Sequence, residues 1–398
     1  MQHLPQFVQD LGVILITAAV VTLIFKRLKQ PVVLGYIMAG LLVGPHFPFV
    51  PNVTDTAGIK VWAEIGIIFL LFGVGLEFSF KKLKEIGVTA LCIASFKILF
   101  MLLLGFIAGK ILKWSFSASL FLGAILSISS TTIIISALKE ISFKQKRYLS
   151  LIVGILIVED VIAIIMLALL PMLVTFKTVS GWDILAPIFS LSVFLLFYLL
   201  IGIFVLPVFI KKIHPLMNDE TRLILCLGLC FIMAILSNRL GLSSVLGAFV
   251  MGSLLAETVE GKQMEQLIIP VRDLFAAVFF VSVGMLIDPQ AIYEHYLQII
   301  LLSILTLVGK FIATTIGALL SGEKIKNSVQ AGMGLAQIGE FSFIMVTLAI
   351  SLGIVEEFLY PVTVAISCIT TFTTPYMLRS SESFSCWVEQ KFGARRGT

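Results

Sequence analysis

The sequence has little charge. Only 13% of its 398 residues are Asp, Glu, Lys or Arg, whereas 59% are hydrophobic and the mean hydropathy is +1.09. Such values exclude a soluble globular protein and predict an all-α membrane protein that crosses the bilayer many times. The five cysteines show no spacing typical of a metal site or a disulfide framework. The net charge of +5 does not require nucleic acid as a partner, because basic residues gathered on one side of a membrane explain it.

Hydropathy predicts thirteen membrane spans. They are expected at residues 8–25, 31–49, 61–79, 86–109, 116–138, 148–175, 183–210, 222–238, 242–257, 266–287, 297–320, 328–352 and 358–378. With the N-terminus outside, most basic residues fall in inside loops, so the C-terminus is expected in the cytoplasm. We therefore expect a membrane transport domain over residues 1–379 and a short cytoplasmic tail over residues 380–398.

An internal repeat relates the first six spans to the last six. The matched segments are VVLGYIMAGLL (32–42) with SVLGAFVMGSLL (244–255), AEIGIIFLLFGVGL (63–76) with RDLFAAVFFVSVGM (272–285), and SFKILFMLLLGFIAG (95–109) with VGKFIATTIGALLSG (308–322). The match places Gly35 on Gly247 and Lys97 on Lys310, which chance similarity between apolar helices does not easily produce. Because the linking span 183–210 separates the copies (about 8–175 and 222–378), they enter the membrane from opposite sides. Inverted repeats typically place a transport site near the midplane, beside broken helices.

Two adjacent acids, Glu159 and Asp160, lie near the middle of the apolar segment 148–175. A charge at the bilayer centre costs roughly 2.5–3.5 kcal/mol on insertion scales, so these acids indicate ion or proton handling. Neighbouring helix residues point about 100° apart, so Asp160 can face a cavity while Glu159 faces another helix. We expect Lys310 to pair with Glu159 and Lys97 to be a second buried cation. The alternative, that these groups snorkel to water, is weak so far from the helix ends.

Two polar stretches are candidates for helix breaks: LSISSTTIIIS (126–136) and GMGLAQIGEFSF (332–343). Serine and threonine hydroxyls can bond freed backbone groups, and glycines permit unwinding where the chain lines a cavity. The alternative is that these small residues only pack helices together. We expect Glu340 to neutralise helix N-termini, with Lys97 as a counter-charge. The expected polar groups are, near the ion, Thr131 and Thr132, and, in the crossing helices, Ser130, Gln337, Glu340 and Lys97.

The motifs PVVLGYIMAGLLVGP, LLFGVGLEF, SISSTT, VEDV, RDLFAAVFFVSVGM and GLAQIGEFSF together resemble the monovalent cation:proton antiporter-2 family, with its Kef-type and NapA-type members. The resemblance implies an NhaA/NapA-like fold with a core of spans four to six and eleven to thirteen. It also implies crossing broken helices at spans five and twelve, and usually a homodimer. The family's essential aspartate falls on Asp160, the position before it on Glu159 and its membrane lysine on Lys310.

The expected function is secondary exchange of Na⁺ or K⁺ for H⁺, because Asp160 can hold a proton or a cation but not both. If a cation competes for Glu159 and Lys310 then releases its proton, two protons are exchanged per cation; if Lys310 is structural, the exchange is one for one. A Kef-type channel and an ion-coupled organic-anion symporter are the alternatives. No enzymatic activity or cofactor is expected. A separate cytoplasmic regulatory subunit and a bacterial inner-membrane location are further expectations.

Overall fold

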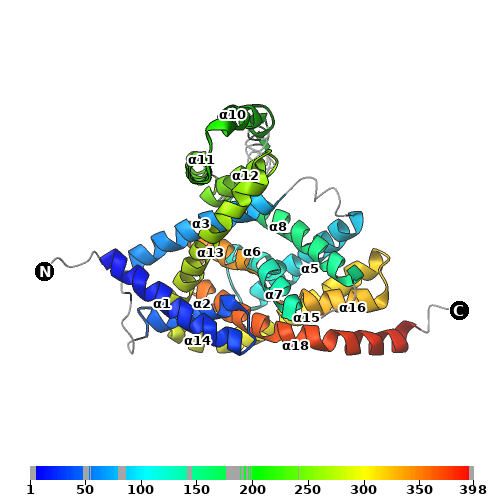
Figure 1. Cartoon of the computed structure of the whole chain (residues 1–398). Coiled ribbons are helices and arrows are strands. Elements are labelled where there is room, and N and C mark those ends of the chain that lie inside the picture. Colours follow the sequence, from blue (N-terminus) through cyan, green and yellow to red (C-terminus); the bar gives the residue numbers. More distant parts are fainter. Residues whose placement is uncertain are drawn as a thin grey trace. The chain divides into compact units, whose positions relative to one another are not determined.

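The computed structural model describes residues 6–47, 53, 55–78, 87–140, 146–175, 200–240 and 242–393, with single residues between 189 and 198. These residues form helices and connecting turns without strands, as Figure 1 shows. The helices are α1 (Gln6–Arg27), α2 (Val32–Val43), α3 (Thr56–Glu77), α5 (Val88–Ile111), α6 (Phe116–Ser127), α7 (Thr131–Glu140), α8 (Lys146–Thr175), η1 (Ile201–Val205), α10 (Leu206–Ile213), η2 (His214–Leu216), α11 (Asp219–Arg239), α12 (Ser244–Ala256), α13 (Gly261–Met285), α14 (Pro289–Glu294), α15 (Tyr296–Leu320), α16 (Ile325–Gly334), α17 (Glu340–Ser351) and α18 (Leu359–Gly393).

Within the described residues, eight segments are long and apolar enough to cross a membrane. The all-α, polytopic fold is therefore confirmed, whereas the number of thirteen spans stays a prediction. Most of the expected linking span 183–210 before residue 200 lies outside the described residues.

Two predicted spans differ in length from the corresponding helices. The span predicted at 31–49 ends as a helix at Val43, because Gly44 and Pro45 follow and the residue before a proline disfavours the helical conformation. The last helix, α18, does not end near residue 378 but continues to Gly393, so most of the predicted tail is helical. Its buried residues Leu378, Ser381 and Ser385 recur at helical spacing, so this extension has a packed face.

The chain forms two compact units. Unit 1 comprises residues 1–18, 42–85 and 164–285, and in it α3 packs against α12 and α13. One close approach lies at Gly252, where a Cβ atom would stand 2.3 Å from the carbonyl oxygen of Phe72. Membrane helices commonly approach through such small residues, because lipid provides no hydrophobic force that drives helices together.

Unit 2 comprises residues 19–41, 86–163 and 286–398, and it contains the spans that the family resemblance assigns to the core, except for residues 164–175 of the sixth span. Here α5 packs against α6 and α15, and α16 packs against α15 and α18. A cluster of buried apolar residues on α8, between Tyr148 and Val158, packs against residues of α5, α7, α15, α16 and α18. One face of the first half of α8, which ends at the two acids, is therefore buried in protein.

The repeat is visible in unit 2 as two matched sets of helices. In one set the long helix α5 packs on a span broken between Ser127 and Thr131; in the other, α15 packs on a span broken between Gly334 and Glu340. The predicted unwinding is confirmed in both spans. Gly332 and Gly334, which we expected to permit unwinding, lie within α16 instead, and only Gly339 lies in the break. Gly332 has a packing role, since a Cβ atom there would lie 2.3 Å from the Thr315 hydroxyl of α15.

The substitution Gly252→Ala should lower the thermal unfolding temperature of the purified protein in detergent. The added methyl group collides with main-chain atoms of α3, and overpacking of this kind costs about 1–3 kcal/mol. Gly228→Ala on α11 is the matched control, because no atom lies within 4 Å of its hypothetical Cβ and alanine favours the helix. Equal melting temperatures for the two variants would contradict the close contact between α3 and α12.

Candidate cation and proton site

The two helix breaks cross each other and exchange hydrogen bonds. The N–H of Gly339 donates to the carbonyl oxygen of Ile128 at 3.0 Å, and the Ser129 hydroxyl donates to the carbonyl oxygen of Leu335 at 3.0 Å. A Cβ atom on Gly339 would lie 2.6 Å from the carbonyl oxygen of Ser129, so this position requires glycine. The breaks therefore satisfy each other's main-chain groups, as a non-helical segment inside a membrane must.

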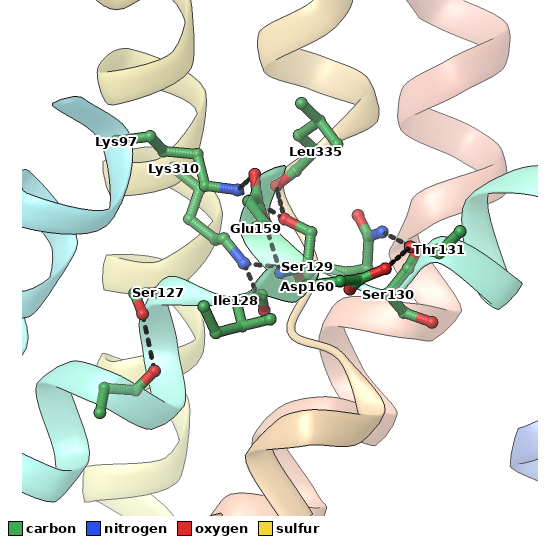
Figure 2. Close-up of polar contacts among 12 residues, drawn as sticks. Lys97, Ser127, Ile128, Ser129, Ser130, Thr131, Glu159, Asp160, Lys310 and Leu335 are labelled. Carbon is green, nitrogen blue, oxygen red and sulfur yellow. Dashed lines mark hydrogen bonds and ion pairs between the residues drawn. The ribbon is translucent and has the colours of Figure 1, made fainter. Parts of the chain in front are cut away.

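Lys310 of α15 joins both breaks. Its side chain is fully buried, and its Nζ donates to the carbonyl oxygens of Ile128 at 2.8 Å and of Gln337 at 2.6 Å (Figure 2). These carbonyls follow α6 and α16, whose C-terminal ends carry partial negative charge. The predicted pairing of Lys310 with Glu159 is therefore wrong, because Lys310 bonds carbonyl groups that the two breaks leave without helical partners.

Lys97 of α5 is the lysine that pairs with Glu159. Both side chains have no exposed surface, and the Lys97 ammonium forms an ion pair with one oxygen of the Glu159 carboxylate. The same ammonium donates to the Ser129 hydroxyl at 2.7 Å, and the Ser129 N–H donates to the other Glu159 oxygen at 2.9 Å. Lys97 is thus not the counter-charge of Glu340 that we expected, because α5 packs directly beside the first break.

Asp160 lies on a different side of α8 from Glu159, as the helix geometry predicted. The residue is partly exposed, and its carboxylate accepts a hydrogen bond from the Thr131 hydroxyl at 3.1 Å. Thr131 is the first residue of α7, so the unwound segment is residues 128–130 and ends just before the two threonines. Asp160 and Thr131 together present oxygen atoms of the kind that bind hard cations.

Glu340 lies at the first position of α17, as expected for a residue that neutralises a helix N-terminus. Its carboxylate accepts hydrogen bonds from the hydroxyls of Ser130 and, at 3.1 Å, Thr132, which stand at the start of α7. Gln337 donates to the carbonyl oxygen of Ser130 at 3.4 Å. One carboxylate therefore serves the N-terminal ends of both half-helices, where partial positive charge gathers.

The sequence predicted that the Ser129 hydroxyl can bond a freed main-chain group, as it does at Leu335, but not that Ser129 also contacts the ion pair. This residue contacts Lys97, Glu159 and the carbonyl of Leu335, so it connects the ion pair to both helix breaks. The only feature of the sequence that points to Ser129 is its place in the polar run SISSTT. In the part of the chain that the structure describes, no group of three or more His, Cys, Asp or Glu residues forms a candidate metal site.

The fold and this crossing define an inverted-repeat membrane protein of the secondary-transporter class. The family model described as "Sodium/hydrogen exchanger, transmembrane" matches residues 14–379. The chain therefore belongs to this family, and the resemblance to the monovalent cation:proton antiporter-2 family is confirmed.

Two curated relatives and one solved structure illustrate the similarity. The chain is 31% identical to K(+) efflux antiporter 5 of Arabidopsis thaliana, over 94% of this chain and 66% of the plant protein. It is 30% identical to the K(+)/H(+) antiporter subunit KhtU of Bacillus subtilis, over 89% of this chain and 88% of KhtU. The sodium proton antiporter MjNhaP1 from Methanocaldococcus jannaschii shares the fold, with a TM-score of 0.72 and 17% identity over 96% of this chain and 98% of that structure. The chain spans just under two thirds of the plant relative's length.

Replacing Lys310 by methionine should destabilise the protein strongly. The change leaves two buried carbonyl groups without their donor, at about 1–3 kcal/mol each, while the apolar volume is nearly kept. Lys324→Met is the control, because this lysine is exposed at the start of α16. The measurement is the thermal unfolding temperature in detergent, and equal values for the two variants would contradict the role of Lys310 in joining the breaks.

Proposed function

We propose that this protein exchanges a monovalent cation, Na⁺ or K⁺, for protons across the membrane, and that Asp160 is the shared binding site. The observation that carries the proposal is the difference between the two adjacent acids. Glu159 is fully buried and bonded through both oxygens, whereas Asp160 is partly exposed and bonded to the Thr131 hydroxyl. An ion can therefore approach the exposed part of Asp160, whereas use of Glu159 would break a buried ion pair.

The chemistry follows from competition for one carboxylate. A protonated Asp160 has lost the charge that attracts a cation, and a cation-bound Asp160 has no free charge for a proton. The carboxylate and the Thr131 hydroxyl supply oxygen atoms, and water can complete the coordination of the ion. Release of one ion on one side of the membrane and capture of the other on the same side give exchange.

Alternating access is supported by the way in which the site is built. Every residue that contacts Glu159, Asp160, Lys310 or Glu340 in the described hydrogen bonds belongs to unit 2. A movement of unit 2 would therefore carry these hydrogen-bonded groups together. Rigid movement of one helical bundle is the usual mechanism in transporters built from inverted repeats.

The names of the relatives support a cation/proton antiporter, with K⁺ and H⁺ named for KhtU and sodium and protons for MjNhaP1. We further propose a homodimer in the bacterial inner membrane, with the N-terminus outside and the C-terminus in the cytoplasm. The orientation rests on the distribution of basic residues in the sequence, including Lys81, Lys82 and Lys84, which lie outside the described residues.

Asp160→Asn should insert and fold but lose cation-dependent proton movement, with a fall of at least a hundredfold in initial rate. The amide keeps the size and the hydrogen-bonding capacity of the side chain but cannot hold a proton or balance a cation. The assay follows internal pH in proteoliposomes after Na⁺, K⁺, Li⁺ or Rb⁺ is added.

Asp288→Asn, at the start of α14, is the control and should transport normally, since asparagine also caps helices well. Exchange in Asp160→Asn near the wild-type rate would place the site elsewhere. Ion movement that is insensitive to the proton gradient would instead indicate a channel.

Thr131→Val should raise the apparent KM for the cation about threefold to tenfold, because it removes one oxygen ligand and a hydrogen bond worth about 0.5–1.5 kcal/mol. Thr132→Val is the matched comparison, since the Thr132 hydroxyl bonds Glu340 instead of Asp160. We expect it to change the KM less than Thr131→Val does. The opposite order would assign the ligand to Thr132.

A further inference from the structure

The two buried lysines occupy matched positions in the repeat but have different partners. Lys97 bonds a carboxylate and a hydroxyl, whereas Lys310 bonds two main-chain carbonyl oxygens. We propose that Lys97 sets the exchange at one proton per monovalent cation, because it holds Glu159 in a closed ion pair and leaves the exchange to Asp160. This inference rests on the proposed function.

The Lys97–Glu159 ion pair is closed in the sense that solvent does not reach either side chain. Neither Lys97 nor Glu159 has exposed surface, and Glu159 also accepts a hydrogen bond from the Ser129 main chain. A cation that used Glu159 would have to displace both the ammonium and this N–H. Removing one partner from a buried ion pair is strongly destabilising, because it leaves an uncompensated charge inside the protein. Asp160, by contrast, is partly exposed, so an ion can approach it from its exposed side.

The other charges of the crossing are balanced by helix ends. Each half-helix end carries a charge of about half a unit, negative at the C-terminus and positive at the N-terminus. Lys310 faces the carbonyls that follow α6 and α16, and Glu340 stands at the starts of α7 and α17. The positive charge of Lys310 thus faces two partial negative charges, and the negative charge of Glu340 faces two partial positive charges. These side chains have fixed structural partners throughout the exchange.

Charge conservation then gives the stoichiometry. Asp160 binds either one proton or one monovalent cation, so both loaded forms of unit 2 have the same net charge. In a full cycle one cation leaves the carboxylate on one side and one proton takes its place, and the reverse occurs on the other side. No net charge crosses the membrane. In a two-proton scheme, a cation that binds Glu159 would have to make Lys310 release its proton. Lys310 bonds two main-chain carbonyl oxygens and not Glu159, so a cation at Glu159 does not displace it.

The test uses the wild-type protein in proteoliposomes whose membrane potential is held near zero by equal thiocyanate on both sides. With matched tenfold gradients of cation and protons in the same direction, a one-for-one exchanger is at equilibrium, so we expect no net proton movement. An imposed membrane potential, inside negative, should leave this balance unchanged, although it would drive any exchange that moves net charge.

Net proton movement at matched gradients, or a balance point that moves with the imposed potential, would overturn the inference. If the protein does not exchange cations for protons at all, the result is different, because a cation gradient alone would then move no protons. The cation gradient alone is therefore measured first, on the same vesicles.

Variants test whether Lys97 is the cause. In the wild type, the logarithm of the cation KM should change by one unit per pH unit at most, because one proton competes. In Lys97→Gln, the Glu159 carboxylate loses its counter-charge and becomes a second group that takes up a proton or a cation, so the slope should exceed one. Lys97→Arg keeps the positive charge and should restore the slope to one.

The double variant Lys97→Gln/Glu159→Gln, which removes both charges together, should also return the slope to one. A merely structural lysine would change the amount of folded protein but not this slope. A slope of one in folded Lys97→Gln would show that Lys97 does not limit the proton count.

Discussion

Main-chain groups that leave a helix inside a bilayer must find partners within the protein, since hydrocarbon offers none and each unsatisfied group costs several kcal/mol. Two breaks in this chain, at residues 128–130 and 335–339, meet this requirement by crossing each other. The absence of a side chain at Gly339 permits the approach. Serine hydroxyls and the Lys310 ammonium supply the remaining donors. The crossing is therefore a single hydrogen-bonded unit, and the site depends on it.

The same requirement decides what each charged side chain does. Lys310 serves carbonyl groups at the C-terminal ends of two half-helices, and Glu340 serves the N-terminal ends of the two others. Lys97 neutralises Glu159, which is turned into the protein and held by Ser129. Asp160 differs from these groups because it is partly exposed and bonded to a hydroxyl. The charged side chains with fixed partners thus hold the site in place, while the Asp160 carboxylate can exchange a proton for a cation.

Local signals made the helices, the breaks and the acidic pair predictable. Long apolar runs define spans, a polar run within such a segment marks a break, and adjacent helix residues must diverge, as Glu159 and Asp160 do. Which lysine pairs with Glu159 was not predictable, because Lys97 and Lys310 are equivalent in the repeat. That choice depends on where the carbonyls of Ile128 and Gln337 lie after folding. Hydropathy also placed the end of α2 too late, because it ignores the turn signal at Gly44 and Pro45.

The central claim is that a cation and a proton compete for Asp160. The most direct measurement is the proton release that accompanies cation binding to the purified protein in weakly buffered detergent solution near neutral pH, followed with a pH indicator while Na⁺ or K⁺ is added. The account predicts release that saturates with the cation, does not exceed one proton per protein chain, and disappears in Asp160→Asn. Equal proton release from the wild type and Asp160→Asn would contradict it, because the competing group would then lie elsewhere in the protein.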